Sequence, residues 1–383
     1  MVAVAACGGK YAGTTTSPSS RAAPVGLEAA ALPYQVLARN GTQVDEAAFW
    51  TGISRARAVC IGEEHPNPHH HWVQLHVVRE IAKRRGNAKL AVGFEMIQRP
   101  FQGPLDDYAA KRIDADALRS RTGWAERWGY DFGFYGPTMD AAIAGGGALL
   151  ALNAPKELVK KIVRHGLESL TADEKAQVPE LKLDDAAHRA WFDALMEGMG
   201  GSGAHAKTES GGAKQSGDAP PTTTPHGSPH DDAEDTPAMP SAERIYTAQV
   251  LWDETMADGG ATWLKANATG HLVILAGNGH CHDSAIIGRL KRRGITDAVS
   301  IRAVIDDGAG GLAEILAKPI NDYLVVLKLP NQPAHRTATN PLRPHGSRVS
   351  RATSRSEGEV GSARTWHSAS DVLGVGTVRA ASH

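Results

Sequence analysis

Short runs of apolar residues alternate along the middle of the chain with longer stretches in which apolar residues recur at helical spacing. The apolar runs predict strands at 58–62, 90–95, 148–153 and 272–276, with further strand-like runs at 299–305 and 323–329. The stretches between them predict helices over 68–85, from Pro155 onward, and over 184–197, 243–266 and 284–293. Buried strands that alternate with helices predict an α/β fold in which helices cover both faces of a mainly parallel sheet.

Three segments lack this pattern and are rich in small or polar residues. Residues 1–33 are mostly Gly, Ser, Thr, Ala and Pro, which predicts a flexible tether, and the insert at 198–241 combines Gly, Ser and Pro with a short acidic run. The tail at 331–383 is rich in Arg and Ser. None of the three holds enough large apolar residues to offset the entropy of ordering. We therefore predict disorder in all three, and one α/β domain over 34–330.

The net charge and the number of cysteines limit the classes of partner and of fold that the sequence allows. The formal net charge of the 383 residues is −1, so the chain has no overall positive field to attract nucleic acid. No apolar run approaches the ~20 residues that cross a bilayer. The three cysteines, Cys7, Cys60 and Cys281, are too few for a disulfide framework, and no CxxC pair is present.

Cys7 is the most informative of the cysteines. It ends the run Val4-Ala5-Ala6-Cys7, which resembles the lipobox before the acylated cysteine of bacterial lipoproteins. The residues before Cys7 hold neither the basic nor the apolar region of a signal peptide, so this interpretation predicts a start codon further upstream. The alternative is a chance cysteine in a disordered N-terminus.

Ionisable residues follow three of the predicted strands. Glu63 and His65 end the first strand, Glu95 ends the second, and His280 follows the strand at 272–276. Open parallel sheets bind ligands at the carboxyl ends of their strands, so we predict that these four residues share a cleft. Carboxylates beside imidazoles suit a metal such as zinc or iron, or general acid and base catalysis. The alternative is a set of hydrogen-bonded polar groups at strand ends.

Two further features surround these strand ends. On the helix predicted from Pro68, His71 lies one turn before Leu75 and faces inward, while His69 faces solvent. The stretch 123–137 gathers aromatic residues, including Tyr130 and Tyr135, in a chain with only 5% of them. Such residues suit a planar apolar ligand, and Tyr is a known haem ligand type. The alternative is packing of a Gly-rich loop onto the sheet.

Six ordered motifs resemble those of the ChaN-like family of haem-binding bacterial lipoproteins: IGEEHPNPHHHWVQ, VGFEMIQR, GWAERWGYDFGFYGP, LLALNAPKELV, AQVLWDETMA and ILAGNGH. The resemblance spans about 57–328 without the insert, and the superfamily also includes Tiki proteases and erythromycin esterases. It implies an α/β sandwich with a smaller helical subdomain, an outer-membrane lipid anchor on Cys7, and haem carriage in iron acquisition with Tyr ligation. The positions that match the motifs are Glu63, His65, Asn67, His70, His71, Gln74, Glu95, Asn153, Gln249, Asp253, Asn278 and His280.

Two functions follow as expectations. The first is a haem-binding lipoprotein of the cell envelope, with a haem uptake receptor and a second copy of the chain as partners. Its expected cofactor-binding residues are Tyr135, Tyr130, His70, His71, Asn153 and Asn278. The second is a hydrolase of ester or amide bonds, in which Glu63, His65, Glu95 and His280 hold a divalent metal or form an acid/base set. A scaffold that recruits partners through its insert and tail is a third hypothesis.

Overall fold

The computed structural model describes residues 31–198 and 241–329, and every structural statement below concerns these residues. The predicted tether with Cys7, the insert and the tail lie outside the described residues, except at their edges.

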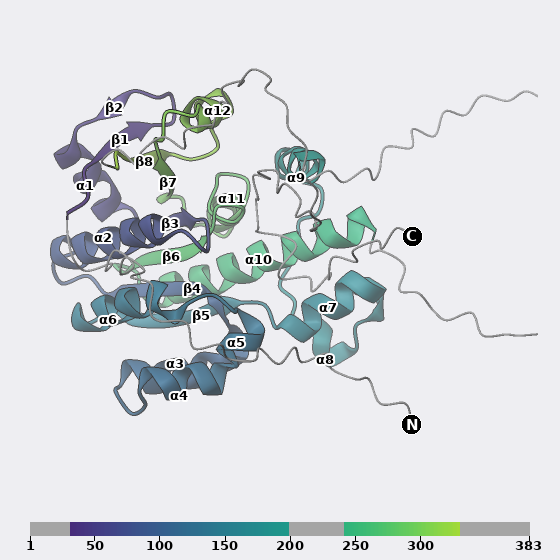
Figure 1. Cartoon of the computed structure of the whole chain (residues 1–383). Coiled ribbons are helices and arrows are strands. Elements are labelled where there is room, and N and C mark those ends of the chain that lie inside the picture. Colours follow the sequence, from purple (N-terminus) through teal and green to yellow (C-terminus); the bar gives the residue numbers. More distant parts are fainter. Residues whose placement is uncertain (1–30, 199–240, 330–383) are drawn as a thin grey trace, which may run out of the picture.

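The described strands form one mixed sheet in the order β2-β1-β8-β7-β3-β6-β4-β5 (Figure 1). Adjacent strands from β8 to β5 are parallel, whereas β1 is antiparallel to both β2 and β8. The strands are β1 (Tyr34–Ala38), β2 (Gln43–Val44), β3 (Ala58–Glu63), β4 (Leu90–Gln98), β5 (Ala148–Asn153), β6 (His271–Gly277), β7 (Ala298–Ile305) and β8 (Tyr323–Leu327).

The helices begin where the sequence carries start signals. Asn67 caps α2, since its side chain accepts from the His69 amide and Pro68 occupies the first turn. Ser241 caps α10 in the same way, through the Arg244 amide. The helices are α1 (Glu46–Arg55), α2 (Pro68–Arg84), α3 (Gln102–Ala109), α4 (Ala115–Thr122), α5 (Trp124–Arg127), α6 (Gly136–Ala144), α7 (Lys156–His165), α8 (Ala172–Lys175), α9 (Ala186–Gly198), α10 (Ala242–Ala266), α11 (Ile286–Arg292) and α12 (Gly311–Ala317).

Each central strand is buried on both faces. Along β3, Val59 and Ile61 pack into the core beneath α1, α2 and α6, while Ala58 and Cys60 pack into the core beneath α7, α10 and α11. This alternation follows from the two-residue period of a strand, and it requires apolar side chains at every position. The prediction of a mainly parallel sheet with helices on both faces is confirmed.

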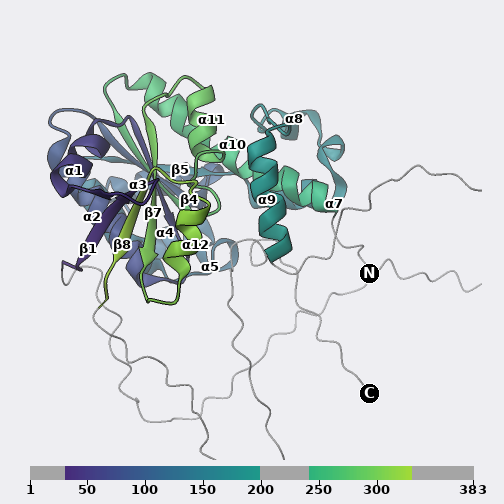
Figure 2. The same cartoon turned by 90° about the horizontal axis from the view of Figure 1, so that it is seen from above.

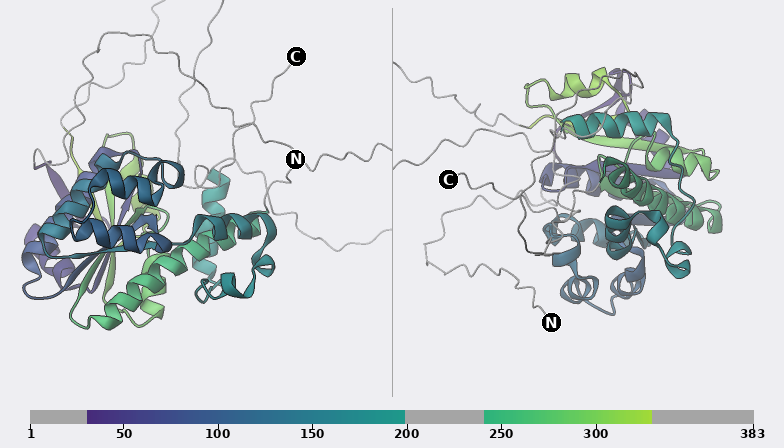
Figure 3. Two further views of the ribbon diagram at one scale, coloured as in Figure 1. Left: turned by 90° about the horizontal axis from the view of Figure 1, so that it is seen from below. Right: turned by 90° about the vertical axis from the view of Figure 1, so that its right-hand side faces the viewer.

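The predicted smaller helical part is also present. Figure 2 shows α7, α8 and α9 set apart from the sheet, and the left view in Figure 3 shows the long helix α10 extending from the sheet to this part. Phe192, Tyr246 and Val250 form a separate apolar cluster where α9 packs against α10. Among the described residues, no helix has the length and apolar character needed to span a membrane.

The sheet order places a switch point at the centre of the molecule. From β3 the chain continues to β4 on one side, and from β6 it continues to β7 on the other side, although β3 and β6 are neighbours. The loops that follow these two strands therefore diverge, which opens a ligand site at their carboxyl ends.

A disulfide joins the two elements at this switch point. Cys60 in β3 is bonded to Cys281, which follows β6, with Cα atoms 5.3 Å apart. This bridge was not predicted from the sequence. The reason is that β3 and β6 are adjacent in the sheet, although the two cysteines are 221 residues apart in the sequence. The bridge fixes the loop after β6 to the central strand.

Candidate functional site

The carboxylate of Glu63 is the centre of the first buried network. Its Oε1 accepts hydrogen bonds from the Tyr135 hydroxyl at 2.9 Å and from Nδ1 of His65 at 2.7 Å, and its Oε2 lies 3.0 Å from Nδ1 of His71. Burial alone would raise the pKa of Glu63, but the charges and hydrogen bonds of His71 and His65 hold it well below its usual range. Glu63 is therefore a carboxylate inside the protein.

The polar contacts of His71 suit an imidazole that carries a proton on both nitrogens. Its Nε2 donates to the carbonyl of His65 at 2.9 Å, and its Nδ1 faces Glu63 and Oε1 of Gln74, the latter at 3.1 Å. Gln74 presents its oxygen because its Nε2 donates to the carbonyl of Ile61. Every polar neighbour of the two ring nitrogens is thus an acceptor. Burial opposes the charge, but Glu63 outweighs it and raises the pKa of His71. The prediction that His71 faces inward is confirmed.

His65 and Glu95 approach each other over Gly277. A Cβ on Gly277 would lie 3.0 Å from Cε1 of His65 and 3.7 Å from Oε2 of Glu95, so it would crowd the imidazole and make an ordinary contact with the carboxylate. Glu95 Oε2 accepts from the Gly277 amide at 2.7 Å. The pairing of β4 with β5 shifts register between Phe94 and Gln98, the stretch that contains Glu95.

His280 lies between two carboxylates. Its Nδ1 is 2.7 Å from Oδ1 of Asp253 on α10, and its Nε2 is 3.4 Å from Oε1 of Glu95. Burial alone would lower the pKa of His280, but Glu95 and Asp253 raise it to about 10. The same pairing lowers the pKa of Glu95 against the effect of burial. His280 is therefore an imidazolium that connects the sheet to α10.

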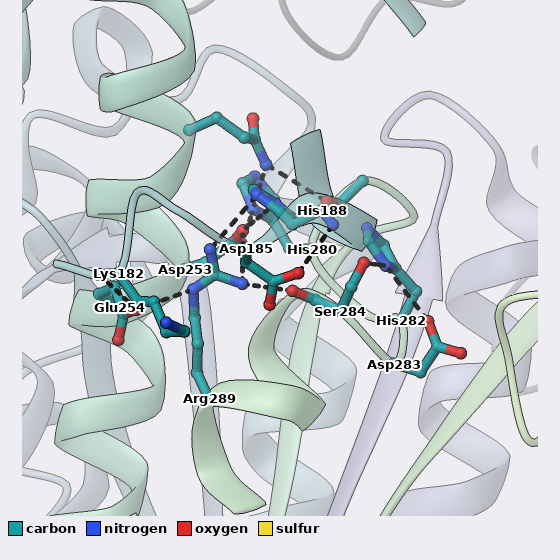
Figure 4. Close-up of polar contacts among 12 residues, drawn as sticks. Lys182, Asp185, His188, Asp253, Glu254, His280, His282, Asp283, Ser284 and Arg289 are labelled. Carbon is teal, nitrogen blue, oxygen red and sulfur yellow. Dashed lines mark hydrogen bonds and ion pairs between the residues drawn. The ribbon is translucent and has the colours of Figure 1, made fainter. Parts of the chain in front are cut away.

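Asp253 extends this second network into the helical part (Figure 4). Its Oδ2 lies 3.0 Å from Nε2 of His188 on α9 and 3.7 Å from Nη1 of Arg289 on α11. Arg289 is 2% exposed and also contacts Glu254, which pairs with Arg292 and with Arg293 at 2.6 Å. Buried charges of this kind are tolerated only when each is paired.

The four residues predicted as one cluster thus divide between two networks. His65 binds Glu63, and His280 binds Asp253 and Glu95, while His65 and Glu95 adjoin each other at Gly277. Among the described residues, no group of three or more His, Cys, Asp or Glu side chains is arranged to hold a metal ion. The predicted metal site at Glu63, His65, Glu95 and His280 is therefore not found in this part of the chain.

The two tyrosines of the aromatic stretch occupy different environments. Tyr135 is fully buried, and burial together with the charge of Glu63 raises its pKa well above the ordinary value. Tyr130 is half-buried in the loop after α5, and its ring lies 5.0 Å from that of His65 and 5.6 Å from that of Trp128. The structure therefore places Tyr135 inside the first network and not on an aromatic surface.

The other predicted ligand-binding residues contact the backbone around the site. Nδ1 of His70 accepts from the Glu64 amide at 2.9 Å, and burial lowers the pKa of His70 to about 3. Asn153 donates to the Glu95 carbonyl at 2.8 Å, and Asn278 lies directly over Gly62, where a Cβ would meet it. His69, expected to face solvent, is half-buried.

A small cleft, with about 20 Å³ of space open to a water-sized molecule, lies at the carboxyl ends of β4 and β5. Glu95 and Asn153 belong to its lining. Its apolar lining includes Trp128 from the aromatic stretch and Trp252 from α10. The second network therefore reaches the cleft through Glu95, and Trp252 lies next to Asp253 in the chain.

The sequence prediction omitted several residues of the second network. Asp253 matched a motif but had no predicted role, and His188 and Arg289 had no place in the predicted site. One usable signal was the pair Asp253-Glu254 in the middle of an otherwise apolar stretch of a helix, since unpaired charges are almost never buried.

The fold and the site define an α/β protein in which buried carboxylate and imidazole networks lie beneath a cleft at the carboxyl ends of parallel strands. Residues 49–290 match the model of the family described as haem-binding uptake, Tiki superfamily, ChaN. The match covers more than half of the chain, and the chain belongs to this family. The resemblance seen in the sequence motifs is thereby confirmed. No curated protein sequence gives a significant match.

Solved structures agree with this assignment at the level of the fold. The chain is similar to ChaN of Campylobacter jejuni, which binds haem cofacially, with 14% identity, a TM-score of 0.52, and 77% of this chain and 97% of that chain covered. An erythromycin esterase in its open conformation is more distant, with 13% identity, a TM-score of 0.37, and 78% and 83% of the two chains covered.

Proposed function

We propose that this protein binds haem at the cleft beside Trp128 and carries it in haem or iron acquisition at the bacterial envelope. The observation that carries the proposal is the position of Tyr130. This phenol is half-buried, packs on Trp128 and His65, and so lies beside a cleft that both tryptophans line. A partly exposed tyrosine with aromatic neighbours fits a planar apolar group whose ferric iron takes a phenolate ligand.

Different residues of the site would contact different parts of the haem. Tyr130 would ligate the iron, Trp128 and Trp252 would contact the porphyrin, and His65 and Glu95 would hold the floor below it. When bound, haem supplies an iron centre and a strong visible absorbance, which makes binding directly measurable. Membership of the family and the cofacial haem binding of the Campylobacter jejuni protein support this proposal.

The test is a haem titration of the full chain followed by absorbance in the Soret region. We expect saturable binding with a spectrum typical of tyrosinate ligation, and Tyr130→Phe should lose that spectrum. Tyr108→Phe is the matched control, because the Tyr108 hydroxyl donates to Asp140 at 2.7 Å and is not part of the cleft. Failure of the wild type to bind haem would overturn the proposal.

We also propose that the chain is attached to the outer membrane by a lipid on Cys7 and delivers haem to an uptake receptor. The lipobox-like run and the Cys60–Cys281 bridge support this, since disulfides persist in oxidising compartments such as the bacterial envelope. Incorporation of a labelled fatty acid that is lost in Cys7→Ser, expressed from the complete reading frame, tests the anchor. A homodimer is proposed as the haem-bound form, and light scattering with and without haem tests it.

A hydrolase of ester or amide bonds is the second candidate, and one observation favours it. Asp253 holds Nδ1 of His280 at 2.7 Å, so Nε2 of the ring points to Glu95 at the cleft. A carboxylate that orients an imidazole in this way is the arrangement by which hydrolases move a proton. Turnover of p-nitrophenyl esters that disappears in both Glu95→Gln and His280→Ala would support it. Absence of turnover by the folded wild type would remove it.

A further inference from the structure

Three cations converge on one rim of the cleft. Arg127 ends α5, and Lys156 and Lys160 lie one turn apart on α7, so they share a face of that helix. All three line the cleft. Their charge is opposite to that of the Glu95 carboxylate, which also belongs to the lining. The helix α7 also begins here, and the N-terminus of a helix carries a partial positive charge.

The positive charges of this cationic rim (Arg127, Lys156 and Lys160) are incompletely neutralised. Arg127 pairs with Glu157 at 2.8 Å, whereas Nζ of Lys156 donates to a backbone oxygen, that of Glu126, at 2.6 Å. Lys160 is exposed and makes no ion pair within the described ranges. Burial, and then the nearby charges of Lys160 and Arg127, lower the pKa of Lys156, and the charges of Glu157 and Glu126 oppose this shift only in part.

The rim is also held firmly in place. Oε1 of Gln98, at the end of β4, accepts from Nη1 of Arg127 at 2.8 Å and from the backbone amide of Lys156 at 3.1 Å. One side-chain oxygen therefore ties α5 and the start of α7 to the sheet. A ligand that binds this rim therefore meets a guanidinium and a helix start that are already in place, which lowers the entropic cost of binding.

We propose that the cationic rim binds the carboxylates of the ligand, so that the site selects a planar apolar dicarboxylate over its neutral ester. The inference rests on the proposed haem function and assigns the haem propionates to Lys156 and Lys160, with Arg127 behind them. The tryptophans contact the apolar body of the ligand, and the lysines donate charge-assisted hydrogen bonds to its carboxylates. The neutral ester carries no anionic oxygen and cannot accept such bonds.

The test compares haem with haem dimethyl ester, added from the same solvent to the full chain. The wild type should bind haem about tenfold more tightly than the diester at low salt, and this preference should shrink as the salt concentration rises. The double variant Lys156→Gln, Lys160→Gln should bind haem about tenfold more weakly and the diester unchanged. Lys161→Gln is the matched control, since Lys161 lies on the same helix but pairs with Glu174 at 2.7 Å and does not line the cleft.

The outcomes separate the inference from the proposed function. Equal affinity of the wild type for both ligands overturns the inference and leaves haem binding intact, whereas binding of neither ligand overturns both. If the double variant loses affinity for both ligands to the same extent, the lysines maintain the shape of the site and do not recognise the carboxylates. That result would also overturn the inference. If the double variant fails to fold, Lys160→Gln alone provides the test, because its side chain is exposed.

Discussion

Replacement of Tyr135 by Phe separates a structural tyrosine from a haem ligand. The hydroxyl of Tyr135 donates to Oε1 of Glu63 at 2.9 Å from a fully buried ring, and Phe fills the same volume, so no cavity forms. The cost is one hydrogen bond to a charged group, about 1.5–3 kcal/mol. For a domain of this size that cost lowers the melting temperature by about 3–12 °C.

Glu63 keeps its other partners in this variant, so the network weakens without collapsing. His65 still donates at 2.7 Å and His71 still lies 3.0 Å away, so Glu63 stays ionised and the fold persists. Haem affinity and the tyrosinate spectrum should be unchanged, because burial and Glu63 already disfavour the phenolate form of Tyr135. Thermal melts and haem titrations of Tyr135→Phe and Tyr130→Phe measure both effects. A Tyr135→Phe variant of unaltered melting temperature that loses the tyrosinate spectrum would refute this reasoning and return the ligand to Tyr135.

Three further predictions test the networks and the packing of the sheet. The raised pKa of His280, about 10 against 6.5, means that its stabilising charge is present in full below pH 6.5 and is lost as the pH rises through 10. The free energy of unfolding of the wild type, measured with urea, should therefore fall across that window. The His280→Gln variant should be less stable at pH 7, but its free energy of unfolding should change less with pH. Parallel pH profiles of the two proteins would contradict this. Reduction of the Cys60–Cys281 bridge should destabilise the fold by up to about 5 kcal/mol, because the bridge closes a very long loop. Melts with and without reductant measure that loss, and alkylation of both cysteines in the unreduced native protein would show that the bridge is absent. Gly93→Ala should cost about 1–3 kcal/mol in urea unfolding, since its Cβ would overlap the side chain of Leu152, and an unchanged midpoint would show that Leu152 can move aside.

The sequence predicts the parts of the fold that depend on local pattern. The strand at 148–153 and the helix that begins at Pro68 are both found, because strand burial and helix capping are set by neighbouring residues. The antiparallel edge formed by β1 escaped prediction, since its partner β8 lies far away in the sequence and pairing at that distance leaves no local signal. The Cys60–Cys281 bridge was missed for the same reason.

The site was predicted at the correct edge of the sheet, but its partners from the helices were missed. Strand ends fix which edge Glu63, Glu95 and His280 occupy, and the structure brings all three there. Which side chains pair depends on α10, which delivers Asp253 to His280. This contact has no signature within a window of a few residues, so the two networks could be separated only in three dimensions.

The distribution of charge assigns different tasks to the floor and the rim of the cleft. At the floor of the cleft and beneath it, the carboxylates of Glu95, Glu63 and Asp253 have lowered pKa values. They face the imidazoles of His71 and His280, whose pKa values are raised, and the guanidinium of Arg289, so opposite charges are paired inside the protein. A balanced, buried set of charges holds the strands and α10 together but exerts little attraction on a ligand outside it. The cationic rim is partly exposed and only partly paired, so its field extends into the cleft. Attraction of an anionic ligand must therefore come from the rim, which Gln98 ties to the sheet.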